Sequence, residues 1–401
     1  MNLSVLLSLA IACNALSLAS VSNFIGSSPD RIIKTGPDTF QMASEADKLQ
    51  LRRNGEKFID VTGVLSVEQA LSQGSLAGAG DRTIITVFSK QLHSLKKPIP
   101  EYNYPSAPQE TELVESLVEK IDLAAVKSNL AHFTSFHTRY YKSASGLKSA
   151  NWLFDLVSNL VEEVPDATVD KIHHNGWDQY SIIASIPGKS SDKVVVGAHQ
   201  DSINLLFPNI LPAPGADDDG SGTVTTLEAL RLISAAVAAG DFVPQNTLEF
   251  HYYSAEEGGL LGSIDVFTRY FDAGNTVVGM LQQDMTGYIQ GTLDKGVEPH
   301  FGLINDYTSA KQNEFIRMVV DAYCSIPVHE TKCGYACSDH ASAVENGFPA
   351  SFLIESEFKY SATQIHSTMD TMDRLDFEHI REHIQLTIGY AVELASATDL
   401  Y

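Results

Sequence analysis

Three adjacent carboxylates, Asp217, Asp218 and Asp219, stand in a loop of small residues that begins at Gly215. Their negative charges repel one another, and solvent or a bound cation relieves that repulsion. A solvated acidic turn is the simplest interpretation of three such residues taken alone. The surroundings favour a cation, because an apolar run ending at His199 precedes the loop and a helical pattern begins directly after it. We therefore expect one oxygen-rich corner of a metal site.

Residues that could complete this site stand where other apolar runs end. They are His199 and Asp201, Glu256 and Glu257, Asp284, and His366 in a late loop. Zinc takes imidazole nitrogen and carboxylate oxygen, and two zinc ions about 3.5–4 Å apart need a bridging carboxylate. Asp218 suits the bridge, and the others would supply each ion with one histidine (His199 or His366) and one carboxylate (Glu257 or Asp284). Two Zn²⁺ ions against three carboxylates and a hydroxide form a neutral set, which can be partly buried.

The adjacent glutamates Glu256 and Glu257 point different ways from a turning backbone. One can bind metal while the other faces the attacking water as general base, taking its proton and handing it to the leaving amine. Asp201 lies two residues after His199, on the same side of an extended strand. We expect it to accept the other imidazole N–H of His199, as carboxylates beside metal-binding histidines often do.

The elements that must position these residues alternate along the chain from Glu110 onward. Strands are expected at 194–198, 248–253 and 277–283, and helices at 153–161, 223–239, 258–270, 310–322, 339–346 and 377–397. Apolar strands separated by helices predict an α/β fold, with a mostly parallel central sheet and helices on both faces. In such sheets, sites form outside the carboxyl ends of the strands, which is where the polar residues stand.

Composition narrows the classes of protein. The 401 residues, 44% of them hydrophobic, suffice for one large domain and an extra segment. The net charge of −23, with no evident basic patch, argues against a nucleic-acid partner. An acidic chain repels anionic surfaces, so we expect no membrane partner, and we expect a monomer.

Residues 1–19 read as a secretory signal peptide, since Leu3–Ala19 is apolar and uncharged. A membrane anchor is the alternative, but polar residues interrupt the segment and it barely reaches spanning length. Residues 20–90, with a boundary between 85 and 100, are expected to be a removable pro-segment, because residues 21–100 are polar and end in a proline-rich stretch. The alternative is a small N-terminal domain that stays attached. The catalytic domain would then be 91–401, and the protein would be extracellular.

Cysteine usage agrees with export. Cys13 would leave with the signal peptide, and the spacing of Cys333 and Cys337 closes a small ring, which favours a disulfide in an oxidising compartment. Two free thiols or a zinc knuckle are the alternatives, and the knuckle lacks a second cysteine pair. Cys324 is expected to be a buried free thiol.

These motifs together resemble the secreted co-catalytic dizinc aminopeptidases, of the bacterial leucyl and fungal secreted type. The resemblance covers roughly residues 105–401 and rests on His199-x-Asp201, Gly215–Asp219, Ser254–Gly258, Asp284 and Ile365-His366-Ser367. It implies a zinc-dependent exopeptidase fold, two zinc ions per chain, and peptide substrates with a free N-terminus, leucine being preferred. The chain also resembles the fungal members in having an expected signal peptide and pro-segment, which implies that it is made as a zymogen.

The resemblance further implies a role for each residue. His199 and Asp284 would hold one zinc, Glu257 and His366 the other, with Asp218 bridging and Glu256 as the base. The segment Cys333–Cys337 matches a short disulfide loop whose tyrosine, Tyr335, lies near the substrate. Met285, Phe358 and Ile365 match positions that line an apolar pocket for the N-terminal side chain.

Other histidines have simpler interpretations. His379 and His383 are one helical turn apart, but the glutamate precedes the second histidine rather than following the first, so an amphipathic helix is favoured. His173, His174 and His251 lack a carboxylate context and are expected on the surface or in the core. Ser338-Asp339-His340 could support the site, or Ser338 could cap a helix.

Two functional alternatives stay open. One is another enzyme on the same scaffold, such as a one-zinc glutaminyl cyclase or a carboxypeptidase. The other is a non-catalytic ectodomain of the transferrin-receptor kind. Such an ectodomain would be expected to have lost ligands or the base, whereas the set here is intact.

Overall fold

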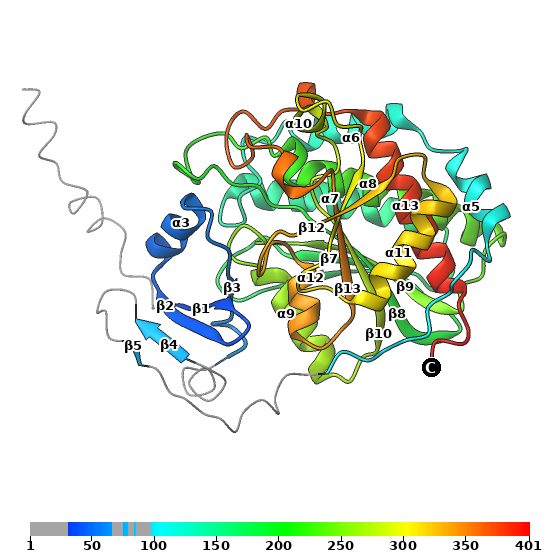
Figure 1. Ribbon diagram of the computed structural model, residues 1–401, viewed down its shortest axis with the longest axis horizontal. Helices are drawn as coiled ribbons and strands as arrows, with labels where there is room; N and C mark the ends of the chain where they lie inside the picture. Colours follow the sequence, from blue (N-terminus) through cyan, green and yellow to red (C-terminus); the bar gives the residue numbers. More distant parts are fainter. Residues whose placement is uncertain (1–30, 66–74, 79–83, 86–97) are drawn as a thin grey trace, which may run out of the picture.

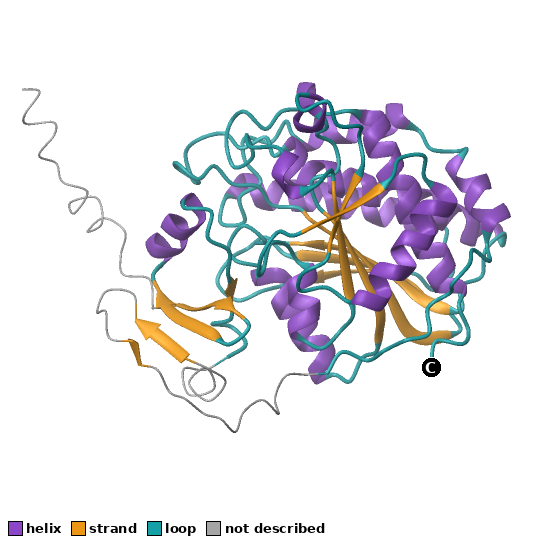
Figure 2. Cartoon of the chain, viewed as in Figure 1, coloured by secondary structure: helices purple, strands orange, loops and turns teal. Residues whose placement is uncertain are grey.

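An eight-stranded sheet runs through the larger part of the chain in the order β12-β11-β13-β10-β8-β9-β7-β6 (Figures 1 and 2). Its strands are β6 (Thr168–Ile172), β7 (Ser181–Ile186), β8 (Ser190–His199), β9 (Asn246–Tyr253), β10 (Val277–Gln283), β11 (Phe301–Ile304), β12 (Val328–Thr331) and β13 (Ala350–Ile354). This computed structural model describes residues 31–65, 75–78, 84–85 and 98–401. The expected signal peptide and most of the expected pro-segment boundary lie outside them.

The four central strands β13, β10, β8 and β9 are parallel to one another, and β11 is parallel to β12. Strands β6, β7 and β11 add antiparallel pairs toward the edges. The mostly parallel sheet is therefore confirmed, and β8, β9 and β10 contain the three expected strands. The central strand β13 and the outer strands β6, β7, β11 and β12 were not expected from the sequence.

Helices cover both faces of the sheet, as predicted (Figure 2). Successive residues of β8 show the alternation: Val194 and Val196 pack in the large core with α8 and α13, whereas Val195 packs with Phe267 and Phe348 on the other side. The first face carries α5 (Thr111–Val118), α6 (Leu123–Phe133), α7 (Ala144–Val161), α8 (Gly222–Ala239), α11 (Ala310–Tyr323) and α13 (Phe377–Ser396). The second carries α9 (Leu261–Asp272) and α12 (His340–Glu345), while the short α10 (Gln290–Leu293) lies in a loop.

Within the described ranges, one helical segment, Ala216–Ala239, is long and apolar enough to cross a membrane, and 72% of its most apolar window is buried inside the protein. It consists of the acidic loop and α8. Burial against the sheet accounts for its apolar character, since a helix in the interior is apolar on all sides.

The carboxyl ends of the central strands lie in register. His199 pairs with Tyr253 across β8 and β9, and Gly197 pairs with Gln282 across β8 and β10. The residues that follow these strands therefore emerge at one edge of the sheet. The acidic loop at 216–221 reaches the same edge at the start of α8.

The N-terminal segment forms a separate five-stranded sheet in the order β3-β1-β2-β4-β5, drawn in blue in Figure 1. Its elements are β1 (Arg31–Gly36), β2 (Thr39–Ala43), α3 (Glu45–Arg53), β3 (Ile59–Asp60), β4 (Ser75–Gly78) and β5 (Ile84–Ile85). Ile32, Phe40 and Ile59 share an apolar cluster with Leu260 and Ile264 of the larger part. The segment is therefore packed against the second face of the large domain.

Candidate metal centre

The acidic loop is buried rather than solvated. Asp217 accepts a hydrogen bond from the backbone N–H of Gly287 at 3.0 Å. Asp219 accepts from the backbone N–H groups of His199 at 3.0 Å and Gly222 at 2.9 Å. The interpretation of a solvated turn is thus wrong: these two carboxylates tie the loop to the ends of β8 and β10 and to the start of α8.

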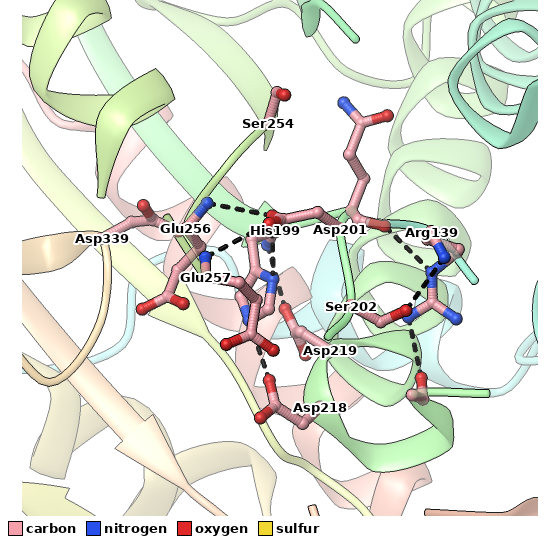
Figure 3. A network of polar contacts seen from close by, with 12 residues as sticks. Arg139, His199, Asp201, Ser202, Asp218, Asp219, Ser254, Glu256, Glu257 and Asp339 are labelled. Atoms are coloured by element: carbon pink, nitrogen blue, oxygen red, sulfur yellow. Dashed lines mark hydrogen bonds and ion pairs between the residues drawn. The ribbon is translucent and has the colours of Figure 1, made fainter. Parts of the chain in front are cut away.

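The middle residue, Asp218, faces two histidines. Its Oδ1 lies 3.0 Å from His199 Nε2, and its Oδ2 lies 2.9 Å from His366 Nε2 (Figure 3 shows the His199 side). One carboxylate therefore presents its two oxygens to two separate groups of donor atoms.

Each group contains one further acidic residue of the expected set. Asp284 Oδ1 lies 3.7 Å from His199 Nε2, and Glu257 Oε2 lies 3.2 Å from His366 Nε2. Asp219 also lies within 4.8 Å of His199 and Asp284. Because backbone amides occupy both of its oxygens, it is a poorer ligand than Asp218.

Several of these atoms are buried without a hydrogen-bond partner: both ring nitrogens of His199, both carboxylate oxygens of Glu257, and Asp284 Oδ1. Buried polar atoms left unpaired are costly in a protein. A bound cation would satisfy them, and mixed imidazole and carboxylate donors are what zinc prefers. The residues present therefore fit two zinc ions linked by Asp218.

The electrostatics of the centre favour positive charge. Burial by itself lowers the pKa of His199 and His366, but the facing carboxylates, above all Asp284 and Glu257, raise both values well above the usual range. Burial would raise the pKa of Asp218, yet the two histidines hold it far below the usual range. The carboxylates around His199 and His366 thus favour positive charge at both histidines.

Asp201 organises the two glutamates. Its Oδ1 accepts from the backbone N–H of Glu256 at 2.9 Å, and its Oδ2 accepts from that of Glu257 at 3.2 Å (Figure 3). His199 Nδ1 lies 3.5 Å from Asp201 without a hydrogen bond. Asp201 thus lies near the imidazole of His199 but does not accept the expected hydrogen bond from it. Its hydrogen-bond partners are the backbone N–H groups of Glu256 and Glu257.

Glu256 belongs neither to the group of ligand atoms around His199 nor to the group around His366. Burial raises the pKa of its carboxyl well above the usual range, and the guanidinium of Arg52 opposes this. Arg52, at the end of α3, donates to the Glu256 carbonyl oxygen at 2.7 Å and lies 3.4 Å from Glu256 Oε2. It also lies 4.0 Å from Glu257 Oε2, so the N-terminal segment reaches into the centre.

A second basic residue of this segment, Lys57, lies nearby. Its ammonium donates to the Cys333 carbonyl oxygen at 2.7 Å and lies 4.1 Å from the centre of the Phe358 ring. Burial lowers the pKa of Lys57 to about 8. The N-terminal segment therefore covers the centre with two cationic side chains.

The structure brings together two of the four expected pocket residues. Met285 and Ile365 pack in one apolar cluster with Ile304, Phe352 and Ile354. Phe358 lies outside this cluster and is 39% exposed. The hydroxyl of Tyr335 donates to Glu345 at 2.8 Å, and its ring packs beside the N-terminal segment.

Backbone strain also gathers at the centre. Ala255, Met285 and His366 adopt left-handed conformations with φ of 59°, 58° and 58°. Each costs roughly 1–3 kcal/mol in a residue other than glycine, and such conformations concentrate at functional sites. Here they lie beside Glu256 and Asp284, and at His366 itself.

Ser338 and the cysteines complete the description of this region. The Ser338 hydroxyl donates to Asp284 Oδ2 at 2.5 Å, and α12 begins after Asp339, so the alternative of a cap at Ser338 is wrong. Cys333 and Cys337 form the expected disulfide. Cys324 is free as expected, but it is half-buried rather than buried.

Four of the other histidines that the structure describes lie outside the centre. His379 and His383 are buried on α13, as expected. His174 and His251 do have carboxylate partners, Asp265 at 2.6 Å and Glu249 at 3.0 Å, so the prediction that they lack such a context was wrong.

His300, His329 and Glu357 also lie close together. Both ring nitrogens of His300 are occupied, by the Glu298 carbonyl oxygen at 2.7 Å and by the backbone N–H of Glu357 at 3.1 Å. This group therefore has too few free donors for a metal.

Charged residues in contact with the centre or its loops that were missed from the sequence include Arg52, Arg139 and Asp370. Asp370 could have been found, because it follows His366 in the same loop. Arg139 offers no sequence signal, since it stands alone between two helices far upstream of His199.

Comparisons with known proteins agree with this geometry. A family model described as peptidase family M28 matches residues 181–391. A probable aminopeptidase of Saccharomyces cerevisiae is 46% identical over 372 residues, which are 92% of this chain and 93% of that protein. Leucine aminopeptidase 1 of Paracoccidioides brasiliensis is 44% identical over 419 residues, covering 99% of this chain and 100% of its own. The crystal structure of the LapA aminopeptidase of Legionella pneumophila is 26% identical with a TM-score of 0.74, covering 94% of this chain and 96% of that one.

Proposed function

We propose that this chain, which belongs to peptidase family M28, is a secreted two-zinc aminopeptidase that removes leucine and other apolar residues from the N-termini of peptides. The family and the relatives named aminopeptidase support the class of reaction. The proposal of two zinc ions rests mainly on the position of Asp218. Its two carboxylate oxygens lie 3.0 Å from His199 Nε2 and 2.9 Å from His366 Nε2.

In this proposal His199 and Asp284 would hold one zinc, Glu257 and His366 the other, and Asp218 both. Zinc, when bound, lowers the pKa of water to about 7 and polarises the scissile carbonyl. Glu256 takes a proton from the attacking water and returns it to the nitrogen of the leaving peptide. The water oxygen ends on the acyl carbon as the C–N bond breaks. Asp201 keeps Glu256 and Glu257 in place through their backbone amides.

Charge favours a free N-terminus over a free C-terminus as the recognised end. The centre is rich in buried carboxylates, which attract an ammonium group and repel a carboxylate. Arg139 is buried and bonded to carbonyl oxygens, and the other cations described above, Arg52 and Lys57, belong to the N-terminal segment. This supports an aminopeptidase over a carboxypeptidase.

The preference for apolar residues is supported by the cluster of Met285 and Ile365 beside the disulfide loop. Secretion is supported by the uncharged leader at 1–19 and by the Cys333–Cys337 disulfide, which is typical of oxidising compartments.

The test compares a leucyl peptide with a free amine and its N-acetylated form, alongside metal analysis of the same sample. We expect leucine release from the free amine alone, two zinc ions per chain, loss of activity on chelation, and recovery when zinc is returned. Hydrolysis of the acetylated peptide, cyclisation of an N-terminal glutamine, or a single zinc would favour the other enzymes on this scaffold.

We further propose that the N-terminal segment inhibits the enzyme until it is removed. Arg52 occupies the approach to Glu256, the expected base, and the apolar cluster with Leu260 and Ile264 holds the segment in place. Arg53 adds two bonds to the carbonyl oxygens of Leu205 and Leu206, at 2.7 and 2.9 Å.

Replacing Arg52 with alanine should therefore raise the activity of the intact chain. A hydrogen bond to a charged group contributes roughly 1.5–3 kcal/mol, so kcat/KM should rise about tenfold or more. The R53A variant is the comparison, because Arg53 holds the same segment through carbonyl oxygens without touching Glu256, and it should raise kcat/KM less than R52A does. Equal activity of wild type and R52A, with an intact chain in both samples, would contradict inhibition by this contact.

A further inference from the structure

Arg139 is a buried arginine that binds no carboxylate directly. It lies between α6 and α7, and its guanidinium lies 4.0 Å from the centre of the Phe133 ring. Its Nε donates to the Gln200 carbonyl oxygen at 2.9 Å, and its Nη2 donates to that of Gly215 at 2.8 Å (Figure 3). Its Nη1 donates to the carbonyl oxygen of Pro214. One side chain thus joins the residue after His199 to the start of the acidic loop.

Asp370 holds the same loop from another side. Its Oδ1 accepts from the backbone N–H of Asp217 at 2.8 Å, and its Oδ2 accepts from that of Asp218 at 3.1 Å. Its own carbonyl oxygen accepts from the backbone N–H of Ala216 at 3.2 Å. Asp370 follows His366 in one loop. Its bonds therefore join the segment that carries His366 to Asp218, the residue that faces His366.

We propose that Arg139 and Asp370 are positioning residues that hold Asp218 between the two metal-binding histidines, Arg139 setting its place relative to His199 and Asp370 relative to His366. This inference rests on the proposed two-zinc function. The two residues bind different groups of the loop. Arg139 donates to its backbone carbonyl oxygens, and Asp370 accepts from its backbone N–H groups.

Such holding is needed because the loop carries three carboxylates whose repulsion would otherwise spread them toward solvent. Residues that orient metal ligands through hydrogen bonds typically change metal affinity 10–100-fold when they are lost. A purely structural role would instead weaken both zinc sites together through the fold as a whole. A positioning role therefore predicts weaker binding of one zinc, whereas a purely structural role predicts weaker binding of both.

The experiment measures zinc affinity in full-length variants that keep one histidine each. H366A retains the His199 side and H199A retains the His366 side. In H366A, we expect R139M to weaken the remaining zinc roughly 10–100-fold and D370N to change it less than about threefold. In H199A, the two effects should be exchanged. Affinity is read by competition with a zinc chelator, and folding by circular dichroism and the urea midpoint of each metal-free variant.

The chain offers a matched control for each substitution. Arg269 on α9 also donates to a backbone carbonyl oxygen, that of His173 at 2.8 Å, with no hydrogen bond or ion pair to the described residues of the centre, so R269M controls for R139M. Asp306 also accepts from two successive amides, those of Cys333 at 3.2 Å and Gly334 at 3.0 Å, so D306N controls for D370N. Neither control should alter zinc affinity on either side.

If R139M does not fold, R139K takes its place, because lysine keeps the charge but cannot form all three bonds. It should weaken the His199 side severalfold and leave the His366 side unchanged. Equal weakening of both sides by either variant, or unchanged affinity in folded variants, would overturn the inference. Failure of the wild type to bind zinc would instead contradict the proposed function itself.

Discussion

Replacing Glu256 with glutamine should lower kcat by roughly 10²–10⁴-fold while both zinc ions stay bound. Glutamine has nearly the same shape but cannot take the proton of the attacking water. Glu256 belongs to neither group of donor atoms around Asp218, so metal binding should not depend on its charge. The measurement is kcat with a leucyl peptide, together with zinc content of the same sample.

The neighbouring glutamate provides the control. Glu257 Oε2 lies 3.2 Å from His366 Nε2, so E257Q should lose zinc on the His366 side and with it the activity. Near-normal turnover by E256Q with two zincs bound would refute the mechanism. Loss of zinc in E256Q with retention in E257Q would show that the two glutamates have exchanged roles.

The central strands and the large helices could be predicted because their apolar periodicity is strong. β10 ends at Gln283 as expected, and α8 and α13 differ from prediction by one residue at an end. The central strand β13 was missed because it is five residues long, and a short apolar run does not distinguish a strand from a buried helix.

Site residues were predictable where they follow a strand, since the topology of a parallel sheet gathers such residues at one edge. His199, Asp284 and the pair of glutamates fall in this class, and the register of β8, β9 and β10 explains why they meet. Arg139 does not follow a strand. Its importance depends on a tertiary contact with the Gln200 and Gly215 carbonyl oxygens, which no local pattern reveals.

The N-terminal segment shows a different limit. Its sequence is polar and predicts neither a sheet nor a contact with the centre. The structure buries Lys48 against Asp60 at 2.6 Å, and packs Phe40 and Ile59 against the large domain. Arg52 is basic in the sequence but half-buried beside Glu256, because charges of opposite sign from distant segments pair only once the chain has folded.

Replacing Asp218 with asparagine should remove both zinc binding and activity. Asparagine offers one oxygen instead of two and removes one of the negative charges that balance the two ions. The loss of affinity should exceed the roughly 10–100-fold cost of losing a supporting residue, because Asp218 faces both donor groups directly. Zinc content after dialysis against a weak chelator measures this.

The control for this variant is the adjacent Asp217. It lies in the same loop and is also buried, but its carboxylate accepts from the Gly287 amide and the Ser221 hydroxyl and belongs to neither group of donor atoms around Asp218. Burial raises the pKa of Asp217 to about 6, so at pH 7 D217N removes a mostly ionised carboxylate, as D218N does, and yet it should keep most of the zinc. If D217N and D218N lost zinc equally, the loop would act through its total charge. If D218N kept two zincs at full affinity, the bridge would be wrong. Loss in D218N alone would assign the bridge to one carboxylate, the one whose oxygens face both histidines.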